Sequence, residues 1–284
     1  MSTNNTFSFA RLALVMKRDL MENWKTNLYR FLGPYAVLLF AMLIGYVGAE
    51  DVDDFREYSS VIFTMFTSIL FLGSIYSASQ IMETMDTQQK RLSYLMLPAT
   101  SLEKFVVRAL YVTVGFVVMA TLAFLLAEAS RFLFMPFFDL PESFHQSIFA
   151  GVFDTSLINS WLHAYVGSNG SGALRSVLVM GWGHSLFILG GCYWQKHPFW
   201  KTLGIMLLVN QLMIMFAFFL AETIGDIDLS IDGEWLEAHI AWVTIEGVLG
   251  FLSILFALLL AFNWWLSYRC FTRSQVIKPK FRLL

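Results

Sequence analysis

Six long and almost uncharged apolar runs constrain this chain more than any other feature of its sequence. They fall at Phe31–Ala49, Ser59–Gln80, Ala109–Ala127, Ser176–Trp194, Thr202–Ala221 and Ile240–Leu266. Each is close to the ~20 apolar residues that a helix needs to cross ~30 Å of hydrocarbon, and none shows the alternation of a membrane β-strand. Charged residues make up 14% of the chain, against roughly 25% in soluble domains. The sequence therefore predicts an all-α integral membrane protein with six transmembrane helices within residues 31–270.

The distribution of Lys and Arg predicts which loops lie inside, because short loops rich in these residues stay in the cytoplasm. If the N-terminus is inside, only Arg56, Arg131 and Arg175 fall outside, which leaves 16 of the 19 basic residues on the cytoplasmic side. Both termini are therefore expected to be cytoplasmic, with a basic tail at 271–284. The same topology predicts an outer loop at 129–173 and an acidic outer loop at 222–239.

The first 30 residues predict an amphipathic helix that lies flat in the inner interface of the bilayer. Apolar residues recur at every fourth position among basic ones, at Leu12, Met16, Leu20, Trp24 and Leu28. Such a helix buries its apolar stripe while anionic headgroups attract its Lys and Arg side chains. Packing of a solvated helix on the protein's own loops is the alternative. In the first interpretation, Gly33 and Pro34 mark the bend into the first span.

Several catalytic patterns are missing from the sequence. It contains no Gly-Lys pair, and so no phosphate-binding loop of the P-loop type. It has no His-Glu-x-x-His and no Cys/His spacing suited to zinc. It also lacks a Gly-x-Ser-x-Gly elbow. We therefore expect no catalytic residue, no metal site and no cofactor within this chain, and no nucleic-acid partner.

Polar side chains inside two of the predicted spans are candidates for a translocation path. At 100° per residue, four of them on the second span lie close to one line. The fifth span carries two adjacent amides near its middle. Close helix packing through small residues is one interpretation, and one wall of a path for an amphipathic substrate is the other. The candidates are Ser60, Thr64, Thr67, Ser74, Asn210 and Gln211.

The cytoplasmic segment 81–104 contains a short apolar stretch that is followed by a helix start. The apolar stretch is Tyr94–Leu97, and Pro98 ends it. Thr100 and Glu103 have the spacing of a capping box, so a helix is predicted to begin here before it enters the bilayer. An apolar knob on a rigid arm is suited to docking into a groove of a partner protein. Insertion of the four residues into the headgroup region is the alternative.

The run TQQKRLSYLMLPATSLEKFVVR resembles a signature of permease subunits of bacterial type-2 ABC exporters, in which Leu-Leu-Pro-Ala-Ser/Thr-x-x-Glu-Lys-Phe follows the second span. The resemblance implies an inner-membrane protein that pairs with a second copy or a paralogue and has spans two and five along the route. It implies that ATP and Mg²⁺ are bound by a separate ATPase subunit. The re-entrant helices of many such permeases are not evident in 222–239. A membrane scaffold or sensor subunit that transports nothing is the alternative function. The residues that the resemblance assigns to ATPase contact are Met85, Arg91, Tyr94, Leu95, Met96, Leu97 and Pro98.

Overall fold

All regular structure in the described part of the chain is helical. A computed structural model describes residues 7–47, 52–138, 140–149, 170–194, 196–225 and 245–273. The longer helices are α1 (Phe9–Glu22), α2 (Trp24–Ile44), α3 (Val52–Ser79), α4 (Gln88–Leu95), α5 (Ser101–Leu110), α6 (Phe116–Phe134), α9 (Gly170–Tyr193), α10 (Pro198–Gly225) and α12 (Ile245–Thr272). Shorter 3-10 turns are η1 (Glu83–Met85), η3 (Met135–Phe137) and η4 (Glu142–His145), and a π-turn, η2 (Tyr111–Gly115), joins α5 to α6.

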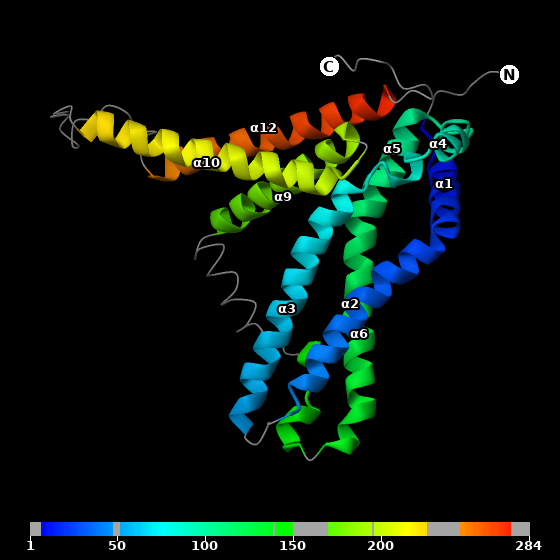
Figure 1. The fold of residues 1–284 in the computed structure, drawn as a ribbon, viewed down its shortest axis with the longest axis vertical. Helices are drawn as coiled ribbons and strands as arrows, with labels where there is room; N and C mark the ends of the chain where they lie inside the picture. Colours follow the sequence, from blue (N-terminus) through cyan, green and yellow to red (C-terminus); the bar gives the residue numbers. More distant parts are fainter. Residues whose placement is uncertain are drawn as a thin grey trace.

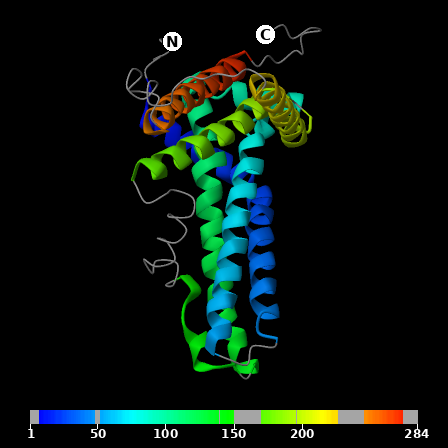
Figure 2. The same ribbon diagram turned by 90° about the vertical axis from the view of Figure 1, so that its left-hand side faces the viewer.

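Three helices, α2, α3 and α6, run side by side along the long axis of the molecule (Figures 1 and 2). Their facing sides are apolar and buried, and the ring of Phe66 on α3 stacks on that of Phe124 on α6 with centroids 4.5 Å apart. Leu38 and Met42 of α2 complete the same core. The lateral packing of these helices therefore explains why their inward positions are large and apolar.

A second group of helices, α9, α10 and α12, lies across one end of the first group (Figures 1 and 2). Helix α9 packs against α10 and α12 and also against α3. At the contact with α3 the two backbones touch, because a Cβ added to Gly191 would lie 2.4 Å from the carbonyl oxygen of Ser79. The two groups are steeply inclined to each other, so the structure does not arrange the six predicted spans in parallel.

Five helical stretches of the described residues are long and apolar enough to cross a membrane. They are Trp24–Ile44, Glu57–Met85, Ser101–Phe137, Pro198–Phe216 and Gly250–Thr272. The fourth predicted span falls on α9, whose apolar part, Val177–Tyr193, is shorter. The all-helical fold is therefore confirmed for the described residues, and these stretches are consistent with a multi-pass membrane protein. Parts of the predicted outer loops, at 150–169 and 226–239, the beginning of the sixth predicted span, at 240–244, and the tail at 274–284 lie outside the described residues.

The break between the N-terminal helix and the helix of the first predicted span lies at Asn23, earlier in the chain than Gly33 and Pro34, where the sequence predicted the bend. Asn23 ends α1 with φ −103° and ψ 20°, and its side-chain amide donates to the carbonyl oxygen of Asp19. Pro34 lies inside α2. Proline removes one helical hydrogen bond, and a span can tolerate that loss when its neighbours stabilise it.

Candidate functional site

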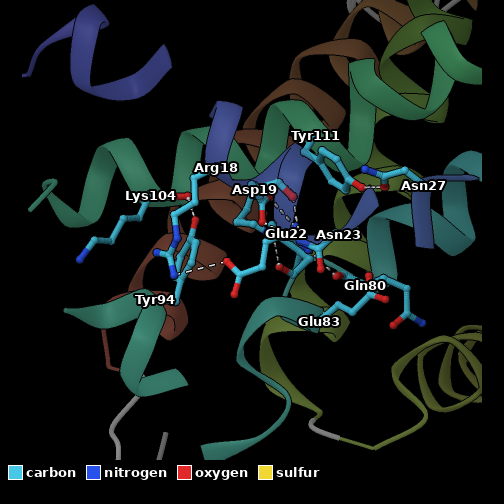
Figure 3. Close-up of polar contacts among 12 residues, drawn as sticks. Arg18, Asp19, Glu22, Asn23, Asn27, Gln80, Glu83, Tyr94, Lys104 and Tyr111 are labelled. Atoms are coloured by element: carbon cyan, nitrogen blue, oxygen red, sulfur yellow. Dashed lines mark hydrogen bonds and ion pairs between the residues drawn. The ribbon is translucent and has the colours of Figure 1, made fainter. Parts of the chain in front are cut away.

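The predicted partner-contact segment lies where α1, the start of α2, residues 80–104 and α5 meet, a region that we call the inner junction. Figure 3 shows its polar side chains: Asp19 comes from α1, Asn27 from α2, Tyr94 from α4, and Lys104 from α5. Residues far apart in the sequence thus converge on one site. Several sets of polar contacts hold it together.

The first set is centred on Glu103, which is 0% exposed. The Thr100 hydroxyl accepts from the Glu103 N–H at 3.2 Å, and the Thr100 N–H donates to the Glu103 carboxylate at 2.8 Å. This reciprocal pair confirms the predicted capping box. The other carboxylate oxygen accepts from the Ser8 N–H at 2.7 Å and from the Arg11 guanidinium at 3.0 Å. One side chain therefore caps α5 and also holds the beginning of α1.

The second set is centred on Arg108, whose side chain is 1% exposed. Its guanidinium donates to Asp19 Oδ2 at 2.8 Å and to the carbonyl oxygens of Ile81 at 2.9 Å and Gln80 at 3.1 Å. Asp19 is also buried, with 3% of its side chain exposed. A buried ion pair is expensive to desolvate, and removal of one partner leaves an uncompensated charge. Arg108 thus fixes α1 and the end of α3 to α5.

A third set joins α2 to the same region. Arg30 pairs with Glu83 at 2.6 Å, and the Tyr111 hydroxyl donates to the side-chain oxygen of Asn27. Arg30 and Asn27 lie in the first two turns of α2, whereas Glu83 and Tyr111 lie on either side of the 88–110 region. The N-terminal end of α2 is consequently tied both to η1 and to the π-turn that follows α5.

Tyr94 anchors segment 81–104 through contacts in the core. Its side chain is buried among Ile81, Met85 and Phe105, and its hydroxyl donates to the carbonyl oxygen of Lys104 at 3.0 Å. Burial raises the pKa of the Tyr94 phenol. In return, Lys104 Nζ donates to the carbonyl oxygen of Leu95 at 2.7 Å. These paired contacts fold the 94–104 turn back onto α5.

The apolar knob expected at Tyr94–Leu97 is narrower in the structure. Tyr94 points into the core, and Leu95 and Leu97 are half-buried against it. Met96 is 80% exposed and Leu92 is 39% exposed, so these two apolar side chains point outward. Arg91 and Met85, which the sequence placed among partner contacts, are both buried, and Arg91 donates to the carbonyl oxygen of Met85. Only Met96 and Pro98 of the predicted set are exposed.

Three of the candidate path residues on α3 donate their hydroxyls to carbonyl oxygens of the same helix. Thr64 donates to the Ser60 carbonyl oxygen at 2.8 Å, Thr67 to that of Phe63 at 3.1 Å, and Ser74 to that of Phe71 at 2.8 Å. Ser60 and Thr64 are exposed, and Thr67 and Ser74 are half-buried. Asn210 and Gln211 are both exposed on α10. The translocation path therefore stays a prediction.

A second charged cluster, at the opposite end of α6, was not singled out from the sequence. Arg131 is 0% exposed and donates to the carbonyl oxygens of Phe144 at 3.1 Å and Gln146 at 2.8 Å. Glu128, one turn earlier, accepts from the Ser147 hydroxyl at 2.8 Å. The signal that could have found this cluster is a pair of charges just past a long apolar run. The Glu128 and Arg131 cluster fixes the 140–149 segment to this end of α6.

Comparison of the chain with protein-family models, with characterised proteins and with solved structures finds no match. Within the part of the chain that the structure describes, no group of three or more His, Cys, Asp or Glu side chains is placed to hold a metal ion. The case for a function therefore depends on the inner junction and on the sequence motif within it.

Proposed function

We propose that this chain is the permease subunit of an ATP-driven exporter in a bacterial inner membrane. The observation that carries the proposal is the exposed Met96 side chain on a turn that buried polar contacts hold in place. The proposal also draws on the sequence resemblance around this turn. A separate subunit would bind ATP and Mg²⁺ and contact Met96, and the chain would work with a second permease.

A docked partner can move the membrane helices only if its contact is mechanically connected to them. Met96 directly follows two residues that are bonded to Lys104 on α5. The Tyr94 hydroxyl donates to the Lys104 carbonyl oxygen, and the Leu95 carbonyl oxygen accepts from Lys104 Nζ. Arg108, one turn further along α5, bonds to Asp19 on α1 and to the end of α3. A displacement at Met96 would therefore reach α1, α3 and α5 together. This connection supports a coupling role for the segment.

The substrate proposed for such an exporter is an amphipathic or lipid-like molecule. Helices α3 and α10 carry the polar positions that the sequence assigned to a path. The two helices also meet, with the rings of Tyr76 and Phe199 at 5.6 Å. These hydroxyls are uncharged and already donate to their own helix, so they have no free donor for a ligand, which suits an apolar substrate more than an ion.

The test is purification of the chain from its native membrane in mild detergent, with measurement of bound ATPase activity. We expect an ATPase subunit to remain with the wild-type chain and to be lost from Met96→Asp, because a charge would have to be desolvated in an apolar contact. Gln89→Asp adds the same charge at another exposed position of α4 and should retain the subunit. Met96→Leu should also retain it.

Two outcomes would count against the proposal in different ways. If no ATPase accompanies the wild-type chain, the exporter proposal fails and the scaffold or sensor function is preferred. If an ATPase accompanies Met96→Asp as well as it does the wild type, docking at Met96 is wrong. The fold control compares chains that have been freed of any bound ATPase: if each variant then elutes in size-exclusion chromatography at the same volume as the wild-type chain, its membrane domain is still folded.

A further inference from the structure

An apolar groove of about 370 Å³ runs between α5 and α12, on the side of α5 away from the Arg108 ion pair. Phe105, Val106 and Ala109 of α5 form one wall with Thr113 of the π-turn, and Trp264 and Tyr268 of α12 form the other. These positions recur three or four residues apart, so each wall is a continuous stripe along its helix. None of the residues that line the groove is charged. The groove is therefore apolar along its length, and it follows α5 and the π-turn from Leu102 to Thr113.

The π-turn Tyr111–Gly115 lies at one end of this groove. Its extra residue per turn widens the helix locally, and such turns are frequent at functional sites. Thr113, which lines the groove, donates its hydroxyl to the carbonyl oxygen of Ala109 at 2.7 Å. Because this hydroxyl already has a hydrogen-bond acceptor in its own helix, Thr113 does not require a polar group in the groove.

We propose that this groove binds one acyl chain of an anionic phospholipid from the inner leaflet. Both walls belong to stretches that are long and apolar enough to cross a membrane, so the acyl chains of a bilayer are the apolar molecules available to the groove. An elongated apolar groove has the shape of a linear chain. Trp264 and Tyr268 are aromatic residues of the kind that gather at the level of the headgroups.

The charge at the end of α12 indicates the kind of headgroup. Arg269 lies in the last turn of α12, with its guanidinium 4.6 Å from the centre of the Trp265 ring, and Arg273 directly follows the end of the helix; both are exposed. The topology expected from the sequence places this end in the cytoplasm, where anionic lipids attract basic residues near the membrane. A phospholipid with a negative headgroup would therefore place its chain in the groove and its phosphate near these arginines. This inference does not depend on the exporter proposal.

The test is photolabelling of the full chain in vesicles of phosphatidylglycerol and phosphatidylethanolamine, with a trace of phosphatidylglycerol that carries a diazirine on its acyl chain. Label is expected to concentrate in peptides that contain residues 102–113 and 264–268. Val106→Trp and Leu110→Trp should fill the groove and exclude about two methylenes, which predicts about a tenfold loss of this label. Leu122→Trp makes the same change at an exposed position of α6 and should not reduce it.

The headgroup is tested with an intact groove. Arg269→Gln combined with Arg273→Gln should lower labelling by phosphatidylglycerol, and phosphatidylcholine that carries the same diazirine chain should label the wild type less. Equal labelling by the two lipids would overturn the assignment of an anionic headgroup. Label spread evenly over the exposed apolar helices, or retained fully in Val106→Trp, would overturn the groove as a lipid site. If the tryptophan variants fail to fold, the peptide map and the arginine variant still decide the question.

Discussion

Replacement of Asp19 by alanine would leave the Arg108 guanidinium buried without its carboxylate partner. The two side chains are 3% and 1% exposed, and their charged atoms are 2.8 Å apart. Loss of one member of such a buried pair costs about 3–5 kcal/mol. Because every 1.4 kcal/mol is a factor of about ten, the equilibrium for undocking of α1 should shift by at least about a hundredfold. We therefore expect α1 to become locally unstable while the distant bundle stays folded.

Hydrogen exchange of the backbone amides of α1, measured in detergent micelles, reports this local opening. Asp19→Ala should speed exchange in α1 by about a hundredfold and leave α6 unchanged. Glu22→Ala is the matched control, because Glu22 is half-exposed and pairs with Arg18 at 3.3 Å. An exposed pair of that kind contributes about 0–1 kcal/mol. The effect of Asp19→Ala should also shrink in an Arg108→Met background. Unchanged exchange in Asp19→Ala, or the same effect in both backgrounds, would refute the reasoning.

Two further predictions concern other contacts. Gly191→Ala should lower the free energy of unfolding by about 1–3 kcal/mol, because the added methyl would overlap the Ser79 carbonyl oxygen. Gly183→Ala is the control: its methyl meets nothing within 4 Å, so the free energy of unfolding should rise by up to about 1 kcal/mol. Equal effects of the two substitutions would contradict this packing. Arg131→Met leaves the carbonyl oxygens of Phe144 and Gln146 without their donors. Limited proteolysis should therefore cut within 140–149 faster than in the wild type. An unchanged rate would show that these bonds do not hold the segment.

The elements that could be predicted from the sequence are those with a local signal. Apolar runs of about 20 residues and the Thr100–Glu103 spacing depend on neighbours within a few turns, and the structure confirms the apolar helices and the cap. The Asp19–Arg108 pair joins residues that are 89 positions apart. No periodicity relates two charges at that distance, so the pair appears only when the chain is folded.

The orientation of short apolar stretches also could not be predicted from the sequence. Tyr94, Leu95, Met96 and Leu97 are all apolar enough for either a core or a docking surface. A helix of eight residues, α4, turns Tyr94 toward Phe105 and leaves Met96 outside. The inclination of α9, α10 and α12 to the other helices likewise depends on long-range contacts such as Gly191 on Ser79. Composition shows that these helices are apolar, and it does not show against what they pack.

The two fully buried arginines place a limit on how α5 and α6 can move. Arg108 and Arg131 are 131 − 108 = 23 residues apart, which is about 35 Å along a helix and close to the ~30 Å thickness of the hydrocarbon. Each donates to two backbone carbonyl oxygens of a segment beyond its own end of the span. Sliding of the helix along the membrane normal would break the bonds at both ends and carry one guanidinium toward hydrocarbon, which is costly. A displacement of the inner junction would therefore reach the 140–149 segment through tilting or rotation of this helix as one body.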